Sequence, residues 1–221
     1  MSARWWAFPL LLVVATGLVG LFLAAFAAVI VYPTLPSLEA LTDYQPKVPL
    51  RIYSVENELI GEFGEERRAV VKIAEVPKPM IDAILAAEDE RFYQHRGVDF
   101  LGVARAALSN FASGGVRQGA STITMQVARN FFLSKEKTVT RKFNEVLLAF
   151  KIEAILSKDQ ILELYINQIY LGQRAYGFAA AAQMYYGKPL DKLSIAEYAM
   201  LAGLPKAPSR FNPIVLSLIH I

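Results

Sequence analysis

The chain of 221 residues contains no cysteine and only two histidines. Without cysteine it cannot build a disulfide framework, a thiolate metal site or a cysteine nucleophile. Two histidines, His95 and His220, are too few for a histidine-rich metal centre. The formal net charge of +3 is too small to indicate binding to nucleic acid, and no internal repeat is evident. Carboxylates, amides, hydroxyls and basic side chains remain as the groups available for chemistry.

Charge is also missing from residues 5–32, which contain no Asp, Glu, Lys or Arg. A helix needs about 20 apolar residues to cross a bilayer, so this segment predicts a transmembrane helix. The alternative is a signal peptide, whose apolar core would be about 7–15 residues long and would end at a small-residue cleavage site that is not evident before Pro33. Arg4 precedes the span and Glu39 follows it, so the positive-inside bias predicts a cytoplasmic N-terminus.

Proline and turn residues divide the rest of the chain. An extended linker is indicated by Pro33, Pro36, Pro46 and Pro49. Residues 50–55 and 59–63 flank a polar turn and predict a small β-hairpin. Beyond Pro79 the pattern is helical, and Ser194 with Glu197 has the capping-box spacing that starts a last helix running to about Ala202.

The expected organisation therefore has five parts. They are a cytoplasmic N-terminus (1–4), a transmembrane helix (5–32), an extracytoplasmic linker with the β-hairpin (33–76), a helical domain (77–213) and a C-terminal tail (214–221).

Glu88 is the first candidate catalytic residue, because it ends an apolar helical pattern. Three aliphatic residues precede it on the same predicted face: Ile81, Ile84 and Leu85. Desolvation raises the pKa of a carboxylate toward the working pH, which is the condition that a general base or acid needs. The alternative is an ordinary ion pair between Glu88 and Arg91 or Lys78.

A glycine-rich loop, residues 114–119, leads into Ser121, Thr122 and a predicted helix start. Free backbone N–H groups at a helix N-terminus favour phosphate binding. The alternative is a surface loop in which Ser121 or Thr122 only caps the helix.

A basic stretch follows the loop. Five basic residues occur within fourteen positions: Arg129, Lys135, Lys137, Arg141 and Lys142. On the helix predicted from about Thr138, Glu145 borders the apolar stripe, with Arg141 and Lys142 one turn before it. The alternative is a solvated salt-bridge face. In an enzyme acting on a diphosphate, the cations would offset the charge of the leaving group, and the carboxylate would orient a cation or hold a divalent metal.

Four motifs occur in a specific order. They are E-D-x-x-F-x-x-H-x-G at 88–97, G-A-S-T-I-T-x-Q at 119–126, R-K-x-x-E at 141–145 and I-L-x-x-Y-x-N at 161–167. Together they resemble the family 51 peptidoglycan glycosyltransferases over about residues 50–213, and the hairpin region resembles class A, bifunctional penicillin-binding proteins. The resemblance implies a mainly α fold, with a lysozyme-like two-lobed glycosyltransferase domain, a small β-hairpin and one N-terminal transmembrane helix.

The resemblance also implies an activity, namely polymerisation of lipid II into β-1,4-linked glycan strands by inverting transfer, with release of undecaprenyl diphosphate. Glu88 matches the general base that deprotonates the acceptor 4-hydroxyl. Glu145 matches a second essential carboxylate that orients the donor diphosphate directly, through a metal or through a neighbouring cation. The matching substrate-binding positions are Asp89, Phe92, Ser121, Thr122, Gln126, Arg129, Lys137, Arg141, Lys142 and Asn167.

Partners and location follow from the same resemblance. No cofactor is implied as required, and a divalent cation, Mg²⁺ or Mn²⁺, is an open alternative beside Glu145. The expected partners are lipid II, the growing lipid-linked strand, the membrane and other cell-wall synthesis proteins, and nucleic acid is not among them. The expected location is the bacterial cytoplasmic (inner) membrane, with a single pass and the catalytic domain in the periplasm.

The sequence departs from the family pattern in two places. Met125 stands where many members carry a glutamine, so one amide contact is missing or is supplied elsewhere. The chain reads only to Ile221, so we expect no transpeptidase domain in it. Ser134 and Lys137 have the S-x-x-K spacing of a penicillin-reactive serine, but no K-T-G follows.

Two other functions fit parts of the pattern. A helical domain with a glutamate in a cleft also describes lysozyme-like hydrolases and lytic transglycosylases. The basic stretch argues against them, because a neutral glycan needs no diphosphate clamp. The second alternative is an inactive membrane-anchored scaffold.

Overall fold

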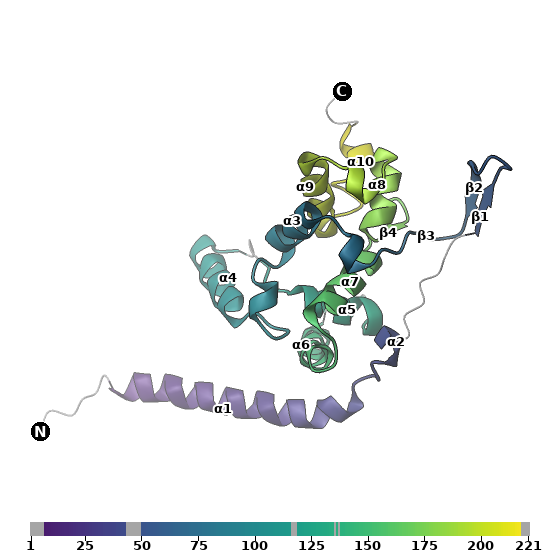
Figure 1. The fold of residues 1–221 in the computed structure, drawn as a ribbon. Helices are drawn as coiled ribbons and strands as arrows, with labels where there is room; N and C mark the ends of the chain where they lie inside the picture. The colour runs from purple at the N-terminus through teal and green to yellow at the C-terminus, as the bar shows by residue number, and fades with distance from the viewer. Residues whose placement is uncertain (1–6, 43–49, 116–118, 135, 137, 218–221) are drawn as a thin grey trace, which may run out of the picture. The chain divides into compact units, whose positions relative to one another are not determined.

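The computed structural model describes residues 7–42, 50–115, 119–134, 136 and 138–217. It divides into two units, Met1–Ser37 and Leu38–Ile221. Helices dominate the described residues, and the few strands are short (Figure 1). The predicted mainly α class, with one apolar N-terminal helix and a small β-hairpin, is confirmed.

The first unit is formed by helix α1 (Ala7–Val31) and the short 3₁₀ segment η1 (Tyr32–Thr34). The stretch Leu11–Thr34 is long and apolar enough to cross a membrane, and none of it is buried. A signal sequence passes the same test, so the helix by itself fits both readings. The two tryptophans that begin the predicted span, Trp5 and Trp6, lie outside the described residues.

The second unit starts with helix α2 (Glu39–Thr42) and contains two small sheets. Strands β1 (Leu50–Tyr53) and β2 (Leu59–Phe63) form the predicted antiparallel hairpin, with Asn57 in the left-handed region (φ 64°) at its turn. Strand β3 (Arg67–Arg68) pairs in parallel with β4 (Ala175–Tyr176) and so joins the linker to the helical domain.

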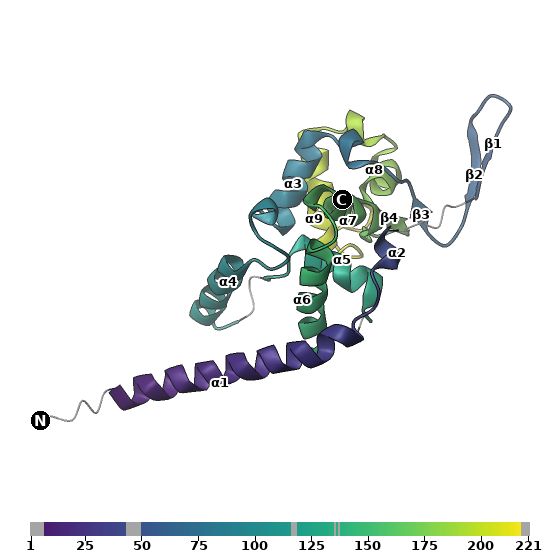
Figure 2. The ribbon, with the colours of Figure 1, turned by 60° about the horizontal axis from the view of Figure 1, so that its bottom comes forward.

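Helices α3 (Lys78–Glu88) and α9 (Ile195–Gly203) lie side by side (Figures 1 and 2). Met80 and Ile84 of α3 are fully buried, and burying such a side chain contributes about 1.5–3 kcal/mol. Helix α9 begins at the predicted capping box, in which the Ser194 side chain accepts from the backbone N–H of Glu197. The local signal therefore identified this helix start correctly.

A second group of helices contains α5 (Ile123–Phe132), α6 (Val139–Glu153) and α7 (Lys158–Gln168), with α5 packed on the other two. Their starts are capped by the side chains of Thr122, Thr138 and Ser157. The core between them is built from fully buried aliphatic side chains: Leu148, Ile152, Ile161, Leu162 and Ile166.

Helix α4 (Phe100–Ser113) stands away from the other helices of the second unit in both ribbon views (Figures 1 and 2). Ala106 is its one buried residue. Its other apolar side chains are largely exposed: Phe100, Leu101, Val103, Leu108 and Phe111. This helix therefore gains little from core packing and must be held in place in another way.

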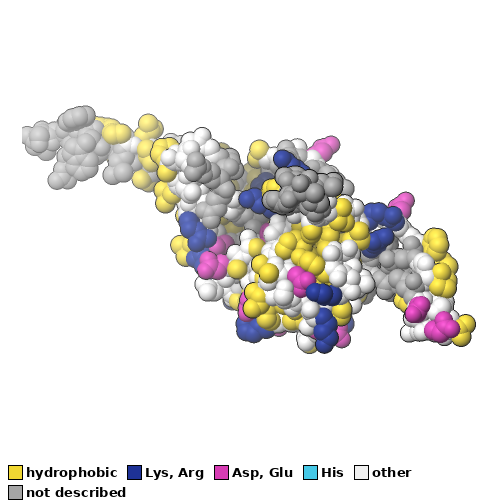
Figure 3. Space-filling view, turned by 90° about the horizontal axis from the view of Figure 1, so that it is seen from above, with side chains coloured by type: hydrophobic (Ala, Val, Ile, Leu, Met, Phe, Trp, Pro, Cys, Tyr) yellow, Lys and Arg dark blue, Asp and Glu magenta, His cyan; other side chains and the backbone are white. Residues whose placement is uncertain are grey.

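Short elements complete the domain. They are η2 (Ile73–Glu75), η3 (Phe92–Gln94), helix α8 (Phe178–Tyr186), η4 (Leu190–Lys192), η5 (Leu204–Lys206) and helix α10 (Pro213–Ser217). Acidic and basic side chains are interspersed over the face of the molecule in Figure 3, a mixture typical of a solvated surface.

The two glycines that flank α8 provide a test of this packing. Gly177 has φ +86°, and a Cβ there would lie 2.9 Å from the carbonyl oxygen of Asn167. Gly187 has φ +64° but no atom within 4 Å of its would-be Cβ. We expect Gly187→Ala to cost about 1–2 kcal/mol through backbone strain alone, and Gly177→Ala to cost clearly more. Thermal unfolding of both variants measures this, and equal losses would contradict the described approach of α7 to α8.

Candidate active site

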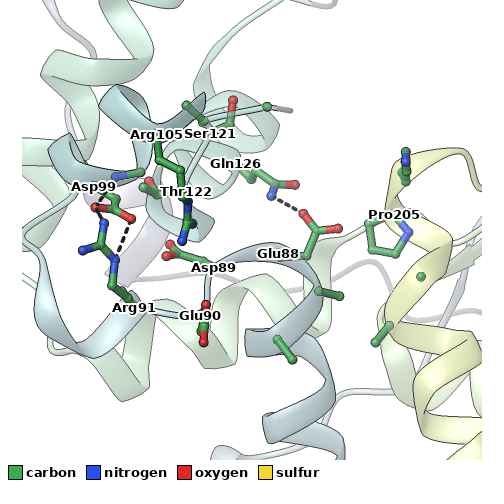
Figure 4. Close-up of a pocket in the computed structure, with 18 of the residues that line it drawn as sticks. Glu88, Asp89, Glu90, Arg91, Asp99, Arg105, Ser121, Thr122, Gln126 and Pro205 are labelled. Atoms are coloured by element: carbon green, nitrogen blue, oxygen red, sulfur yellow. Dashed lines mark hydrogen bonds and ion pairs between the residues drawn. The ribbon is translucent and has the colours of Figure 1, made fainter. Parts of the chain in front are cut away.

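A cavity of about 840 Å³ is lined by the end of α3 and the loop after it, by α4, by the start of α5, by the end of α9 and by η5 (Figure 4). Six of the predicted site residues line it: Glu88, Asp89, Ser121, Thr122, Gln126 and Arg129. The fold therefore brings two of the sequence motifs to a single cavity.

Glu88, the last residue of α3, carries the carboxylate at the centre of this arrangement. Gln126 donates its side-chain amide to Glu88 Oε2 at 2.7 Å. Burial raises the pKa of Glu88, and nearby Asp89 raises it further, while the hydrogen bond from Gln126 and the charge of Arg129 act in the opposite direction. The net effect is a carboxyl group with a pKa above its ordinary value, as a base working near neutral pH needs.

The alternative of an ion pair at Glu88 is wrong. Arg91 binds the carboxylate of Asp99, with its Nε 3.2 Å from Oδ2. Lys78 binds Asp82 at 2.8 Å, one helical turn further along α3. Both cations that could have neutralised Glu88 are therefore used elsewhere.

Asp89 joins the loop after α3 to the start of α5. It is buried, and its Oδ2 accepts a hydrogen bond from the backbone N–H of Ile123 at 3.0 Å. The same carboxylate lies 3.0 Å from Nε2 of His95. These contacts fix the direction in which α3 ends, and with it the position of Glu88.

The N-terminus of α5 is capped by protein groups. Thr122 Oγ1 accepts from the N–H of Met125 at 3.2 Å and donates to the carbonyl of Gly97 at 2.5 Å. Thr122 therefore caps the helix, but it is buried and lines the cavity together with Ser121, so the residues do more than cap a surface loop. Because Asp89 occupies the N–H of Ile123 as well, two donors at this helix end are already used. Phosphate binding at this end of the cavity remains a prediction and depends mainly on side chains.

Glu145 is the seventh residue of α6, nearly two helical turns from its start, and it is only 1% exposed. Arg141 forms an ion pair with its Oε1, and Lys142 with its Oε2 at 3.0 Å. The prediction of a solvated salt bridge is wrong for this carboxylate, because the carboxylate is buried. A buried charge depends strongly on its ion-pair partners. Lys142 also donates to Ser121 Oγ at 2.7 Å, which connects this ionic cluster to the cavity wall.

The surroundings of Lys142 change the pKa of its ammonium group. Its pKa is lowered, first by burial and then by the positive charges of Arg129 and Arg141. Three cations thus lie near one another, with a single buried carboxylate, Glu145, in contact with two of them. The cluster therefore keeps excess positive charge beside the cavity.

The donor set around Glu145 does not fit Mg²⁺ or Mn²⁺. Both carboxylate oxygens already contact cations, and these ions prefer several oxygen ligands around them. Among the residues that the structure describes, no three His, Cys, Asp or Glu side chains gather as a metal site would require.

Two further predicted residues lie away from the cavity lining. Phe92 is fully buried, with Lys158 Nζ 4.3 Å from its ring centre. Asn167 uses its amide on the backbone of the linker, donating to the carbonyl of Val71 at 2.8 Å and accepting from its N–H at 2.9 Å. Neither residue is among those that line the cavity. Lys137 lies outside the described residues.

The cavity also contains two basic residues that the motifs did not identify, Arg105 of α4 and Lys206 of η5. The Arg105 side chain extends from α4 toward Asp89 (Figure 4). Arg105 is the one charged residue between Phe100 and Ser113, and a lone charge in an apolar helix was a usable signal. Lys206 had no such signal, because only the tertiary fold brings η5 to the end of α3.

The chain is similar to known proteins in sequence. The family model described as transglycosylase matches residues 56–217. Penicillin-binding protein 1A of Neisseria cinerea is 64% identical over 196 residues, which cover 89% of this chain and 25% of that protein. Penicillin-binding protein 1A of Pseudomonas aeruginosa is 55% identical over 195 residues, covering 87% and 24%. The chain therefore spans about a quarter of the length of these curated relatives.

The similarity extends to proteins whose structures are solved. The crystal structure of penicillin-binding protein 1A from Haemophilus influenzae shares 33% sequence identity, with a TM-score of 0.39. The match covers 77% of this chain and 16% of that one.

The contact between Gln126 and Glu88 generates a prediction. Leucine at position 126 keeps the volume but removes the donor that favours the charged form of Glu88, so Gln126→Leu should raise the pKa of Glu88 further. Titration of the ¹³C-labelled glutamate carboxyl by NMR measures the shift. An unchanged or lower pKa would show that the amide does not stabilise the carboxylate.

Proposed function

Because the chain belongs to the transglycosylase family, we propose that it is a peptidoglycan glycosyltransferase that polymerises lipid II, with Glu88 as the general base. The observation that carries this proposal is the position of Glu88. Its carboxylate lines a large cavity, is held by an amide, and has a raised pKa without an ion-pair partner of its own among the described residues.

The chemical step follows from this position. The Glu88 carboxylate takes the proton of the 4-hydroxyl of an acceptor N-acetylglucosamine. The acceptor oxygen then attacks the anomeric carbon of the lipid-linked donor strand, the bond from that carbon to the diphosphate breaks, and the configuration inverts to a β-1,4 link. A positioned base of this kind contributes typically about 10²–10⁴-fold to the rate.

The leaving group is undecaprenyl diphosphate, and its negative charge must be stabilised. Arg129 lines the cavity, and Lys142 reaches the cavity wall through Ser121. Preorganised cations at the place where charge develops are among the largest contributions to catalysis. We assign Glu145 to the orientation of Arg141 and Lys142, since it contacts both, and not to a metal.

These cations also favour transfer over hydrolysis. A lytic enzyme acting on a neutral glycan has no diphosphate to bind, whereas Arg129 and Lys142 supply positive charge within reach of the cavity. Asp89, Ser121, Thr122 and Gln126 shape the same cavity. We keep Phe92 and Asn167 as residues that support its walls, in view of their burial and backbone contacts.

Location is part of the proposal. We propose that α1 is a single membrane span with the N-terminus in the cytoplasm, and that the catalytic domain lies in the periplasm at the inner membrane. Lipid II stays in the membrane, so an anchored enzyme searches for it in two dimensions. The exposed apolar side chains of α4, next to the cavity, suit contact with the same membrane surface.

The test replaces Glu88 by glutamine, which keeps the shape but cannot accept the proton. Glu88→Gln should abolish polymerisation of lipid II. Folding raises the pKa of Glu88, so the folded wild-type protein loses stability as pH rises and this carboxyl group ionises. Glutamine does not ionise, so we expect the variant to be at least as stable as wild type at pH 7. Strand formation from fluorescent lipid II and thermal unfolding are measured together.

Glu58→Gln is the matched control, since Glu58 is exposed at the hairpin turn. Wild-type turnover in Glu88→Gln would remove Glu88 from the mechanism. Wild-type protein that cleaves finished glycan but not lipid II would support the hydrolase instead. Binding of lipid II without turnover would support the scaffold.

A further inference from the structure

Helix α4 is attached to the domain at its first turn. Asp99 precedes the helix, and its Oδ1 accepts the backbone N–H of Gly102 at 2.9 Å, which caps the helix. Arg91 donates its Nε to Oδ2 of Asp99 at 3.2 Å and its NH2 group to Oδ1. Ala106 is the one buried residue of α4, so apolar packing holds this helix weakly. The ion pair of Asp99 with Arg91 is therefore the main polar contact that attaches the first turn of α4 to the domain.

The site is shaped for the pair. A Cβ on Gly102 would lie 2.4 Å from Oδ2 of Asp99, so a glycine there lets the carboxylate lie against the helix. Both partners are largely shielded, with 25% of the Arg91 side chain and 17% of the Asp99 side chain exposed. A two-pronged, partly buried pair between arginine and a carboxylate has a fixed geometry, unlike a single exposed contact.

The charge state of the pair is stable at neutral pH. Burial pushes the pKa of Asp99 upward, but the hydrogen bonds from Arg91 and from the N–H of Gly102 outweigh it, and the pKa is lowered overall. The carboxylate is therefore ionised where the enzyme works.

Arg91 follows Glu88 by three residues, in the loop that leaves α3. Arg91, Asp99 and two residues of α4, Gly102 and Arg105, all line the cavity that contains Glu88 (Figure 4). The ion pair thus connects two walls of one cavity, the wall with the base and the wall with Arg105.

We propose that Arg91 and Asp99 are positioning residues, whose ion pair fixes the first turn of α4 to the Glu88 loop and so sets the place of the α4 wall relative to the base. This inference rests on the proposed function and deepens it. Without the pair, Glu88 and the cations of α5 and α6 keep their places. The first turn of α4 is then no longer held at a fixed position relative to Glu88, and the substrate is bound less well.

The central variant is Asp99→Asn, because asparagine keeps an oxygen for the N–H of Gly102 but loses the charge and the second acceptor oxygen that Arg91 uses. Arg91→Gln and the double variant complete a double-mutant cycle. Asp82→Asn is the matched control, since it makes the same chemical change in an exposed pair with Lys78 on the helix that carries Glu88. Each protein is assayed for kcat and KM with lipid II and for amide hydrogen exchange in α4.

We expect Asp99→Asn to lower kcat/KM about tenfold, mostly through KM, and to speed exchange in the first turns of α4 about tenfold. The double variant should lose no more than the worse single variant, and Asp82→Asn should match wild type. Wild-type values for Asp99→Asn in both assays, or losses that multiply in the double variant, would overturn the inference. A wild-type protein without turnover would instead overturn the proposed function, while exchange in α4 still tests the pair.

Discussion

The partial burial of one carboxylate, Glu88, is the constraint around which the rest of the site is arranged. Water would stabilise the ionised form, and the cavity wall replaces only part of that stabilisation, through one amide from Gln126 and the charge of Arg129. The carboxylate is held where it is because Asp89, the next residue, is tied to the N–H of Ile123 and to His95. The raised pKa of this carboxyl group therefore follows from how α3 ends against the start of α5.

The second carboxylate, Glu145, differs from Glu88 in that it has ion-pair partners. Glu145 is more deeply buried than Glu88, but it forms ion pairs with Arg141 and Lys142. Lys142 also donates a hydrogen bond to Ser121, which lines the cavity. One carboxylate thus has no ion-pair partner among the described residues, and the other holds two cations. That division suits a reaction in which one group must take a proton and another set must stabilise a departing diphosphate.

Local signals in the sequence predicted much of this. The hairpin, the start of α9 at Ser194 and the placement of Glu88 at a helix end each depend on a few neighbouring residues, and the structure has all three. The features that the sequence did not predict depend on tertiary contacts. The burial of Glu145 could not be read from its place beside the apolar stripe, and Lys206 reaches the cavity only because α9 packs on α3. The amide of Asn167 is occupied by Val71, which belongs to a distant linker segment.

The most direct test of the account is a crystal structure of the protein with a bound lipid-linked disaccharide diphosphate analogue. The proposed mechanism predicts that the diphosphate contacts Arg129 and Lys142, and that a sugar hydroxyl at the acceptor side lies within about 3.2 Å of the Glu88 carboxylate. A diphosphate bound away from these cations, with no sugar oxygen near Glu88, would contradict the shared role of the two clusters in one reaction.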